Sequence, residues 1–377
     1  MNTPCETSDI LVFSHHKWNM RDQRPQHLIS RYAQIRRVFF IETPTIKQIK
    51  NSHLYSYLSQ EGVTVISPIL SSELSDDLRT IIMEKLLDQL IHKEEISDFT
   101  ALYHTSEALN FTRNLSPSII LFDCFNLNCD DLDEELMSKA QLVFSRGEVQ
   151  SKFKRSIWKN IFSYPCSVDF DHFSKGRKLL TEPADQKEIP YPRIGFYGDL
   201  KNINFKLLDK IAELRPEFQL VVLNECTGPK RENIHYLGLK DYSSLPSYFS
   251  GWDCAFLPYS IDVSSGLITS QQIPELLSSA IPVVSTSIYD SVHPYFDLGL
   301  VHIADHPEHF VQSIESAITD KAQGPEWLER VDHYLLSASW DTTFELMSSL
   351  EHRMKRMMQN IRQPAYEDSS LSAIGIV

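Results

Sequence analysis

Four polar and aromatic side chains follow the first apolar run of the chain and could hold an anion or a sugar. Residues 9–14 read as a buried strand, and Pro25 suits the first position of the helix that comes next. Arg24 would then stand at a helix N-terminus, which attracts anions. An ordinary capped loop with a surface arginine is the alternative. The candidate sugar or phosphate contacts are His15, Trp18, Arg24 and His27.

Two more candidates end apolar runs in the same half of the chain. His104 ends the run 99–104, and Asp123 lies near the end of the run 118–124. The carboxyl ends of parallel strands form the edge of a sheet where ligands bind. At such an edge Asp123 could accept a sugar hydroxyl or a proton as a general base. A structural hydrogen bond explains either residue almost as well, and no nucleophile is assigned.

A third group of candidates surrounds a loop in the second half. The segment 264–280 reads SSGLITSQQIPELLSSA, and its first residues could direct backbone N–H groups at a diphosphate. Glycine allows a ligand to approach the backbone closely, and 7 of the 12 glycines lie between residues 195 and 299. Gly195 and Gly198 are therefore predicted at phosphate-facing turns, with Lys201 as a nearby cation. The predicted loop contacts are Ser265, Gly266, Leu267 and Ile268.

Composition excludes several other classes of protein. The chain has 36 Lys and Arg against 50 Asp and Glu, a net charge of −14, which argues against non-specific nucleic-acid binding. No apolar run approaches the roughly 20 residues of a membrane span, although peripheral membrane contact stays open. The start of the sequence lacks a secretory signal, and six scattered cysteines favour reduced thiols in the cytoplasm rather than a metal site.

The elements that must position these residues alternate between strands and helices. Short, continuously apolar runs rich in β-branched and aromatic residues are typical of parallel strands buried on both faces. The pattern therefore predicts two doubly wound α/β units. Strands are expected at 9–14, 37–42, 63–69, 99–104, 118–124, 141–145, 193–197, 218–223, 234–237, 254–257, 283–286 and 300–303. Helices are expected near 26–35, 76–92, 106–113, 130–139, 148–158, 204–214, 243–250, 271–280 and 306–319.

The domain organisation follows from a change in composition between the two halves. Three prolines and mixed charges without an apolar period predict a linker at 175–192. Residues 1–174 then form an N-terminal Rossmann-like domain, and residues 193–340 form a second one. Residues 341–362 predict an amphipathic helix, followed by a flexible tail at 363–377.

An ordered set of motifs resembles the bacterial glycosyltransferases of the GT-B fold that are related to the retaining family-4 type, a group with a Trp…Gln-Arg-Pro-Gln-His opening. Trp18, the QRPQH of 23–27 and the VFFIE of 38–42 with Pro44 match that opening. The segments SIILFDC, YPCSVDFDHF, PRIGFYGDL, NIHYLG, YSSLPSYFSGWDCAFLPY and PVVST follow in the family's order. The resemblance covers roughly residues 9–350.

The resemblance implies a cleft between the two domains, a final helix that crosses back to the first domain, and roles for particular residues. Glu275 falls on the glutamate that binds the nucleotide ribose, which suits a carboxylate because it can accept two hydrogen bonds from a cis-diol. Two residues depart from the family's pattern: Gln272 replaces a lysine that faces the diphosphate, and Ser270 replaces a proline. A further glutamate of the broader family is also absent, near Leu267.

The expected activity is transfer of a sugar from a nucleotide-sugar donor, with UDP as the expected nucleotide, to a glycan, lipid-linked or small-molecule acceptor. The resemblance implies a retaining, metal-independent enzyme without a bound cofactor. In this interpretation His15, Trp18, Arg24 and His27 lie on the acceptor or phosphate side. The departures leave two alternatives open: a degenerate GT-B protein that only binds a nucleotide or glycan, and a sugar-nucleotide epimerase. The sequence does not determine the oligomeric state.

Overall fold

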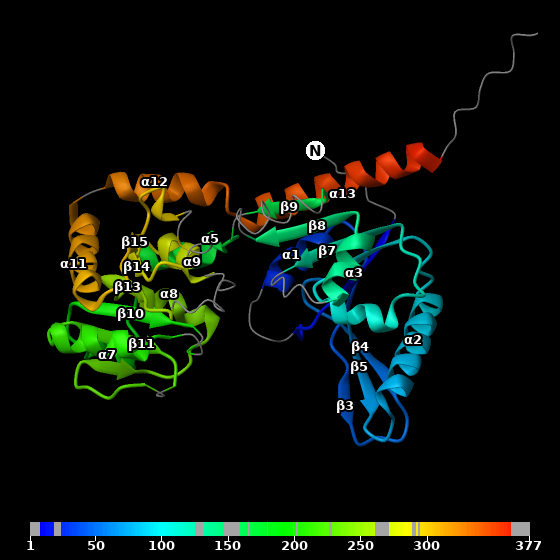
Figure 1. Ribbon diagram of the computed structural model, residues 1–377, viewed down its shortest axis with the longest axis horizontal. Coiled ribbons are helices and arrows are strands. Elements are labelled where there is room, and N and C mark those ends of the chain that lie inside the picture. The colour runs from blue at the N-terminus through cyan, green and yellow to red at the C-terminus, as the bar shows by residue number, and fades with distance from the viewer. Residues whose placement is uncertain are drawn as a thin grey trace, which may run out of the picture.

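Two α/β units lie side by side, and the last helix runs from one onto the other (Figure 1). The computed structural model describes residues 8–18, 24–124, 131–146, 159–164, 166–178, 180–198, 200, 203–225, 228–260, 271–288, 292, 295–323 and 325–362. The side chains of residues 24, 25, 146, 320–323, 361 and 362 are outside this description. The predicted tail at 363–377 also lies outside the described residues.

The N-terminal unit is built on a sheet with nine described strands in the order β3-β5-β2-β1-β6-β7-β8-β9, with β4 beside β5. All of its ladders are parallel except the β4–β5 pair, which is antiparallel. Strands β1, β2 and β6 are buried along their whole length, as expected for parallel strands covered on both faces. The strands are β1 Asp9–Phe13, β2 Val38–Ile41, β3 Thr45–Lys47, β4 His53–Leu58, β5 Thr64–Ser71, β6 Phe99–Tyr103, β7 Ile119–Cys124, β8 Leu142–Arg146 and β9 Ile161–Tyr164.

The C-terminal unit has six described strands in the order β12-β11-β10-β13-β14-β15, and every ladder is parallel. Both sheets reverse their strand order beside their first strand. In the N-terminal sheet this switch lies between β1 and β6, and in the C-terminal sheet between β10 and β13. The strands are β10 Arg193–Tyr197, β11 Gln219–Leu223, β12 Ile234–Tyr236, β13 Cys254–Leu257, β14 Val283–Ser285 and β15 His302–Ile303.

Polar side chains cap the starts of α2 and α7. Ser75 accepts a hydrogen bond from the N–H of Leu78 at the start of α2, and Asn204 accepts one from Leu207 at the start of α7. The helices of the N-terminal unit are α1 Arg24–Ala33, α2 Asp76–Lys93, the 3-10 turn η1 Ser106–Phe111 and α3 Asp131–Lys139. Those that follow are α5 Phe170–Phe173, η2 Ser174–Arg177, α6 Ala184–Lys187, α7 Phe205–Leu214, η3 Tyr242–Ser244, α8 Leu245–Phe249, α9 Gln272–Ser278, α11 Pro307–Gln323, α12 Pro325–Leu336 and α13 Trp340–Arg362.

The expected fold class is confirmed, with strands found at all twelve predicted positions. Three described strands were missed. β3 and β9 are short, and β4 is an exposed antiparallel strand that lacks the continuous apolar run on which the prediction relied. The helix expected near 148–158 lies outside the described residues.

The segment predicted as a linker is packed against the C-terminal unit. The Gln186 side chain is fully buried, accepts a hydrogen bond from the Trp252 indole at 2.9 Å and donates one to the Tyr248 carbonyl at 3.0 Å. The Arg177 guanidinium binds the Ser278 carbonyl in α9 and pairs with Asp332 in α12. The prolines and charges that predict a linker therefore belong to a segment that packs against the C-terminal unit.

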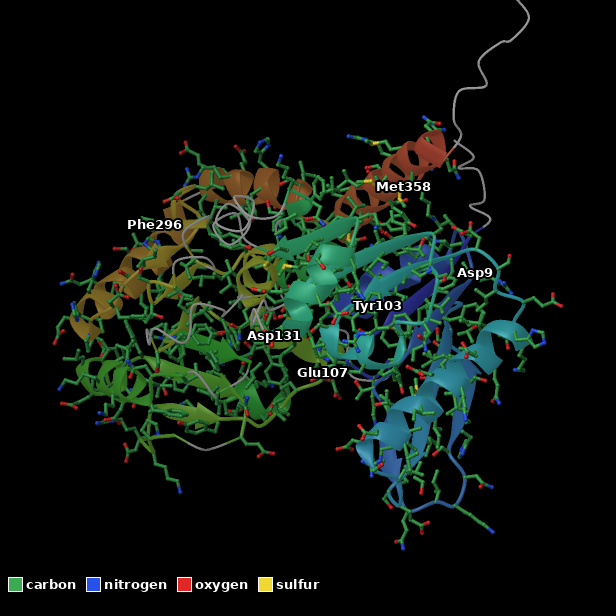
Figure 2. All side chains as sticks on the ribbon, turned by 45° about the vertical axis from the view of Figure 1, so that its right-hand side comes forward. Asp9, Tyr103, Glu107, Asp131, Phe296 and Met358 are labelled. Atoms are coloured by element: carbon green, nitrogen blue, oxygen red, sulfur yellow. The ribbon has the colours of Figure 1, made fainter. Side chains whose placement is uncertain are left out.

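Helix α13 is held on the N-terminal unit by a buried ion pair. Arg36 and Glu351 form two hydrogen bonds of 2.8 and 2.6 Å, and both side chains are 1% exposed. Thr100 on β6 donates to the same carboxylate at 2.6 Å, and the Lys355 ammonium lies 3.0 Å from it. Figure 2 shows Met358 far along this helix, over the N-terminal unit.

Candidate active site

The predicted donor residues gather at the switch point of the C-terminal sheet. Tyr197 ends β10, Gly198 follows it, and Tyr259 lies just beyond β13 on the other side of the switch. Helix α9, which carries Gln272 and Glu275, lies against this edge. In open parallel sheets, ligands bind at such a place because the two flanking loops diverge there.

Gln272 closes the edge between the two strands. Its side-chain amide donates to the Tyr197 carbonyl, and its carbonyl oxygen accepts from the Tyr259 hydroxyl. The side chain is 9% exposed, and a Cβ atom added at Gly198 would lie 1.9 Å from its nitrogen. Gly198 also has a φ of +123°, which L side chains rarely adopt. Gln272 therefore bridges β10 and β13 over a glycine that cannot be replaced without displacing it.

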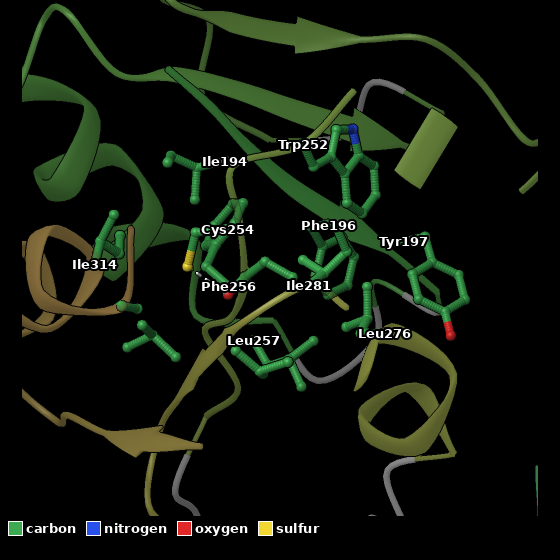
Figure 3. Packing of buried hydrophobic residues seen from close by; sticks show 14 of the residues in the cluster. Ile194, Phe196, Tyr197, Trp252, Cys254, Phe256, Leu257, Leu276, Ile281 and Ile314 are labelled. Carbon is green, nitrogen blue, oxygen red and sulfur yellow. Dashed lines mark hydrogen bonds between the residues drawn. The ribbon is translucent and has the colours of Figure 1, made fainter. Parts of the chain in front are cut away.

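Glu275 faces the same edge from the first turn of α9. One of its carboxylate oxygens accepts a hydrogen bond from the Tyr197 hydroxyl. Burial, together with the Glu275 carboxylate, raises the pKa of the Tyr197 hydroxyl well above its usual range, so it remains a donor at neutral pH. Figure 3 shows Tyr197 at the end of its strand with its hydroxyl directed toward the helix that carries Leu276.

The prediction for Gly195 is wrong. Gly195 lies within β10 rather than in a turn, and an added Cβ would stand 1.9 Å from the Trp252 ring. Its missing side chain makes room for the indole, which is 1% exposed. Asn224, which the sequence analysis did not single out, lies just after β11 and donates to the Gly198 carbonyl at 2.5 Å. The signal that could have found it is its place after an apolar run, in the same register as Gly198.

The N-terminal candidates gather at the other switch point, between β1 and β6. The His104 N–H donates to the Phe13 carbonyl at 2.8 Å, so the ends of these two strands are joined. Nε2 of His104 lies 3.8 Å from a carboxylate oxygen of Asp123, and the Tyr164 hydroxyl donates to the other oxygen at 2.7 Å. The His104 and Asp123 side chains are fully buried. These two side chains therefore lie inside the protein beneath this edge of the sheet, and they are not part of its surface.

His15 and His16 follow β1, and His15 contacts the backbone of the buried His104. The His15 ring hydrogen-bonds to the backbone of His104. The ring centroids of His15 and His16 are 3.9 Å apart. Desolvation lowers the pKa of His15, and it lowers the pKa of His16 to about 4 with a further contribution from His15. Both imidazoles are therefore neutral at pH 7. A neutral imidazole suits a hydroxyl group better than a phosphate.

Trp18 lies in the core. It is 5% exposed, and its ring packs edge-on against Phe40 with the ring centroids 5.0 Å apart. Its backbone N–H donates to the Glu42 carboxylate at 2.8 Å. Ser67 on β5 donates to the other oxygen of that carboxylate at 2.6 Å. Glu42 thus ties the loop after β1 to the sheet, and the structure gives Trp18 a packing role.

His27 lies on α1, close to the start of α13 and to η3 of the C-terminal unit. Its ring stacks on Trp340 at 5.2 Å, and it lies 6.4 Å from the ring of Tyr242 in the C-terminal unit. Tyr242 in turn stacks on His172 at 4.3 Å. The structure therefore places His27 in a column of rings between the units, and Arg24 one turn before it at the start of α1.

Several predicted contacts lie outside the described residues: Lys201 and the loop residues Ser265, Gly266, Leu267 and Ile268. Their roles stay predictions, as does the role of the Arg24 side chain. No cluster of three or more His, Cys, Asp or Glu able to hold a metal occurs among the described residues. No helix in this part of the chain is both long and apolar enough to cross a membrane.

Comparison with solved structures identifies the fold. The chain is similar to a trehalose-6-phosphate synthase from Burkholderia multivorans, with a TM-score of 0.69, 10% identity and coverage of 95% of this chain and 98% of that one. A trehalose-6-phosphate protein from E. coli bound with UDP-2-fluoro glucose matches with a TM-score of 0.65, 11% identity and 93% and 99% coverage. HepE from Anabaena, in complex with UDP and glucose, matches with a TM-score of 0.63 and 10% identity, and the match covers 91% of this chain and 99% of that one.

The fold is that of the GT-B glycosyltransferases. At identities this low, the match establishes the arrangement of the chain and not its chemistry. No protein-family model matches the chain, and no curated protein sequence matches it.

Proposed function

We propose that this chain transfers a sugar from a nucleotide-sugar donor, with UDP as the nucleotide, to a glycan, lipid-linked or small-molecule acceptor. The observation that carries the proposal is the gathering of predicted site residues at the switch points of both sheets. Glu275, Gly198 and Gln272 lie at one, and His15, His104 and Asp123 at the other. The C-terminal unit would then hold the donor, with Arg24 of the N-terminal unit reaching its diphosphate, and the N-terminal unit would hold the acceptor.

On the donor side, Glu275 is the proposed ribose contact. Its carboxylate is oriented by the Tyr197 hydroxyl and faces the edge where Gly198 follows β10. The diphosphate would lie against the loop 264–270 and Lys201, which the resemblance places beside it. The UDP assignment is supported by two proteins of this fold whose structures contain UDP or a UDP-sugar analogue.

On the acceptor side, His15 is the proposed hydroxyl contact, because its neutral ring lies over the joined ends of β1 and β6. Arg24 and the positive end of α1, where it stands, are the proposed anion-binding group of this unit. The burial of His104 and Asp123 favours a positioning role: they support the backbone that His15 binds. Their direct participation in proton transfer stays a prediction.

Retention of anomeric configuration, independence of metal ions and a cytoplasmic setting belong to the proposal and rest on the resemblance. Helix N-termini, together with the side chains of Arg24 and Lys201, would stabilise the charge that develops on the leaving diphosphate. Closure of the units over the donor would exclude water and suppress its hydrolysis.

A thermal-shift screen against UDP-, GDP-, ADP- and dTDP-sugars, followed by a donor-hydrolysis assay, tests the proposal. We expect a UDP-sugar to raise the Tm and to release UDP slowly in the absence of acceptor. If none of these nucleotide sugars raises the Tm, the proposal is contradicted.

A binding protein without turnover is the second candidate, and Gln272 is the observation that favours it. This residue stands where the resemblance implies a lysine, and its amide is engaged by Tyr197 and Tyr259 rather than directed at a ligand. In that case a nucleotide sugar would raise the Tm, but no UDP would be released with or without acceptors.

A further inference from the structure

Strand β4 forms an outer edge of the N-terminal sheet. In the described part of the chain it pairs with β5 alone, in an antiparallel ladder from His53–Ile69 to Leu58–Thr64. Figure 1 shows β3, β4 and β5 at the lower end of this unit, projecting away from α13. Every residue of β4 is exposed or half-exposed.

The ladder determines which backbone groups of β4 point outward. The Ser59 N–H donates to the Val63 carbonyl at 2.8 Å, so this pair at the hairpin end is hydrogen-bonded. Bonded and non-bonded pairs alternate along an antiparallel ladder. The N–H and C=O groups of Leu54, Ser56 and Leu58 therefore point away from β5. Pro68, which has no N–H, stands opposite Leu54 at a non-bonded position, as this alternation requires.

This edge lacks the devices that usually prevent strands from pairing with other chains. Natural edge strands carry Lys, other charges, Pro or a bulge. β4 reads HLYSYL, without Pro, Asp, Glu, Lys or Arg, and it pairs with β5 without a register break. Tyr55 is 55% exposed and Leu58 is 70% exposed. The strand therefore presents both open backbone groups and apolar side chains.

We propose that two copies of this chain associate by antiparallel pairing of their β4 strands, centred on Ser56. The residues Leu54-Tyr55-Ser56-Tyr57-Leu58 form a palindrome. Pairing about Ser56 matches the outward-bonding residues of one copy with those of the other. It also sets leucine opposite leucine and tyrosine opposite tyrosine, and such cross-strand pairs stabilise a sheet. The result is a two-fold symmetric sheet that continues through both molecules.

Charge favours this edge as the point of contact between copies. Each chain carries a net charge of −14, so two copies repel one another over most of their surfaces. At β4 no acidic side chain would face another across the pair. Salt screens the long-range repulsion but does not weaken backbone hydrogen bonds between uncharged groups. Dimerisation should therefore strengthen as the salt concentration rises from about 50 to about 300 mM, because the screening length then falls by a factor of about 2.4.

Sedimentation velocity across a range of protein concentrations tests the proposal with two substitutions at one position. Ser56→Pro removes an outward N–H and leaves the bonds to β5 in place, so it should weaken dimerisation at least tenfold without unfolding the chain. Ser56→Thr keeps the N–H and should dimerise like the wild type. Circular dichroism and Tm confirm that both variants fold. A wild type that is monomeric at every concentration, or a Ser56→Pro dimer of unchanged affinity, would overturn the proposal.

Oxidative cross-linking tests the register. The Cα atoms of the two Ser56 residues would lie about 5.5 Å apart, which a disulfide can span. The Gln60 residues of the two copies would lie about 26 Å apart, eight residue positions at roughly 3.3 Å each. Ser56→Cys should therefore form a covalent dimer above the wild-type background, and Gln60→Cys should not. Equal cross-linking of the two variants would show that β4 is not the interface.

Discussion

Tyr197 and Glu275 form the contact on which the proposed donor site depends. The Tyr197 hydroxyl is buried, its pKa is raised well above the usual range, and it donates to the Glu275 carboxylate. A carboxylate held in this way loses little conformational entropy when it binds a ribose. Tyr197 is thus the proposed positioning residue that acts through Glu275.

Replacing Tyr197 with Phe should raise the Kd for UDP about tenfold, because a hydrogen bond to a charged group contributes roughly 1.5–3 kcal/mol. The ring packing against Phe249 is kept, so the Tm should fall only slightly. Tyr191→Phe is the matched control, since its hydroxyl also donates to a carboxylate, Glu182, away from the site. Isothermal titration calorimetry with UDP measures both. Equal affinities in the two variants would contradict a positioning role for Tyr197.

Among the elements, α13 shows most clearly how distant segments are joined. Its residue Glu351 reaches back to Arg36 and Thr100, which lie more than 250 positions earlier in the chain. Burial alone raises the pKa of the Glu351 carboxyl, but Arg36 and Lys355 outweigh it and hold that pKa below its usual range. Breaking a buried pair by removing one partner typically costs about 3–5 kcal/mol.

Glu351→Gln should lower the free energy of unfolding by roughly that amount at pH 7. A carboxyl whose pKa is lowered by folding stabilises the protein above its unfolded pKa and loses this contribution as pH falls through the folded value. The difference between wild type and variant should therefore shrink below about pH 4.3, the ordinary value for glutamate. Urea unfolding at several pH values measures it. Glu345→Gln, on an exposed position of α13, is the control and should change little.

How far the sequence predicts these elements depends on what each one buries. Strands such as β1 and β10 are buried along their whole length and consist mainly of apolar residues, and their positions were predicted correctly. β4 was missed because it is half-exposed and its identity depends on pairing with β5. Gly195 was misassigned because one glycine beside an apolar run does not reveal that Trp252 will lie against it.

The residues of the proposed site could be located from the sequence where motif order determined them, and could not where packing did. Glu275 and Gly198 were identified by their places in the sequence, and they lie at one sheet edge. The supporting partners Tyr197, Asn224 and Tyr259 come from different strands. Nothing in the local sequence states that they meet Gln272 or Gly198.

For the whole molecule, the account requires both units to contribute to donor binding. Arg24 belongs to the N-terminal unit and Lys201 to the C-terminal unit, so they can serve one diphosphate only if the units close on it. Arg24→Ala and Lys201→Ala should each raise the Kd for UDP several-fold, as expected for loss of a charge-assisted contact.

Fluorescence or calorimetric titration with UDP measures these affinities. Lys206→Ala, within α7, is the control for loss of a positive charge near the same sheet edge and should bind UDP normally. If neither Arg24→Ala nor Lys201→Ala weakens binding, another group holds the diphosphate.

The central claim is that the edge formed by Tyr197, Gly198 and Glu275 binds the nucleotide of a sugar donor. Isothermal titration of the full chain and of Glu275→Ala with UDP tests it most directly, because UDP contains the ribose and diphosphate and does not depend on the identity of the sugar. The account predicts one UDP site per chain and a Kd at least tenfold higher in Glu275→Ala. Equal affinity in the two proteins, or no binding of UDP by the wild type, would contradict it.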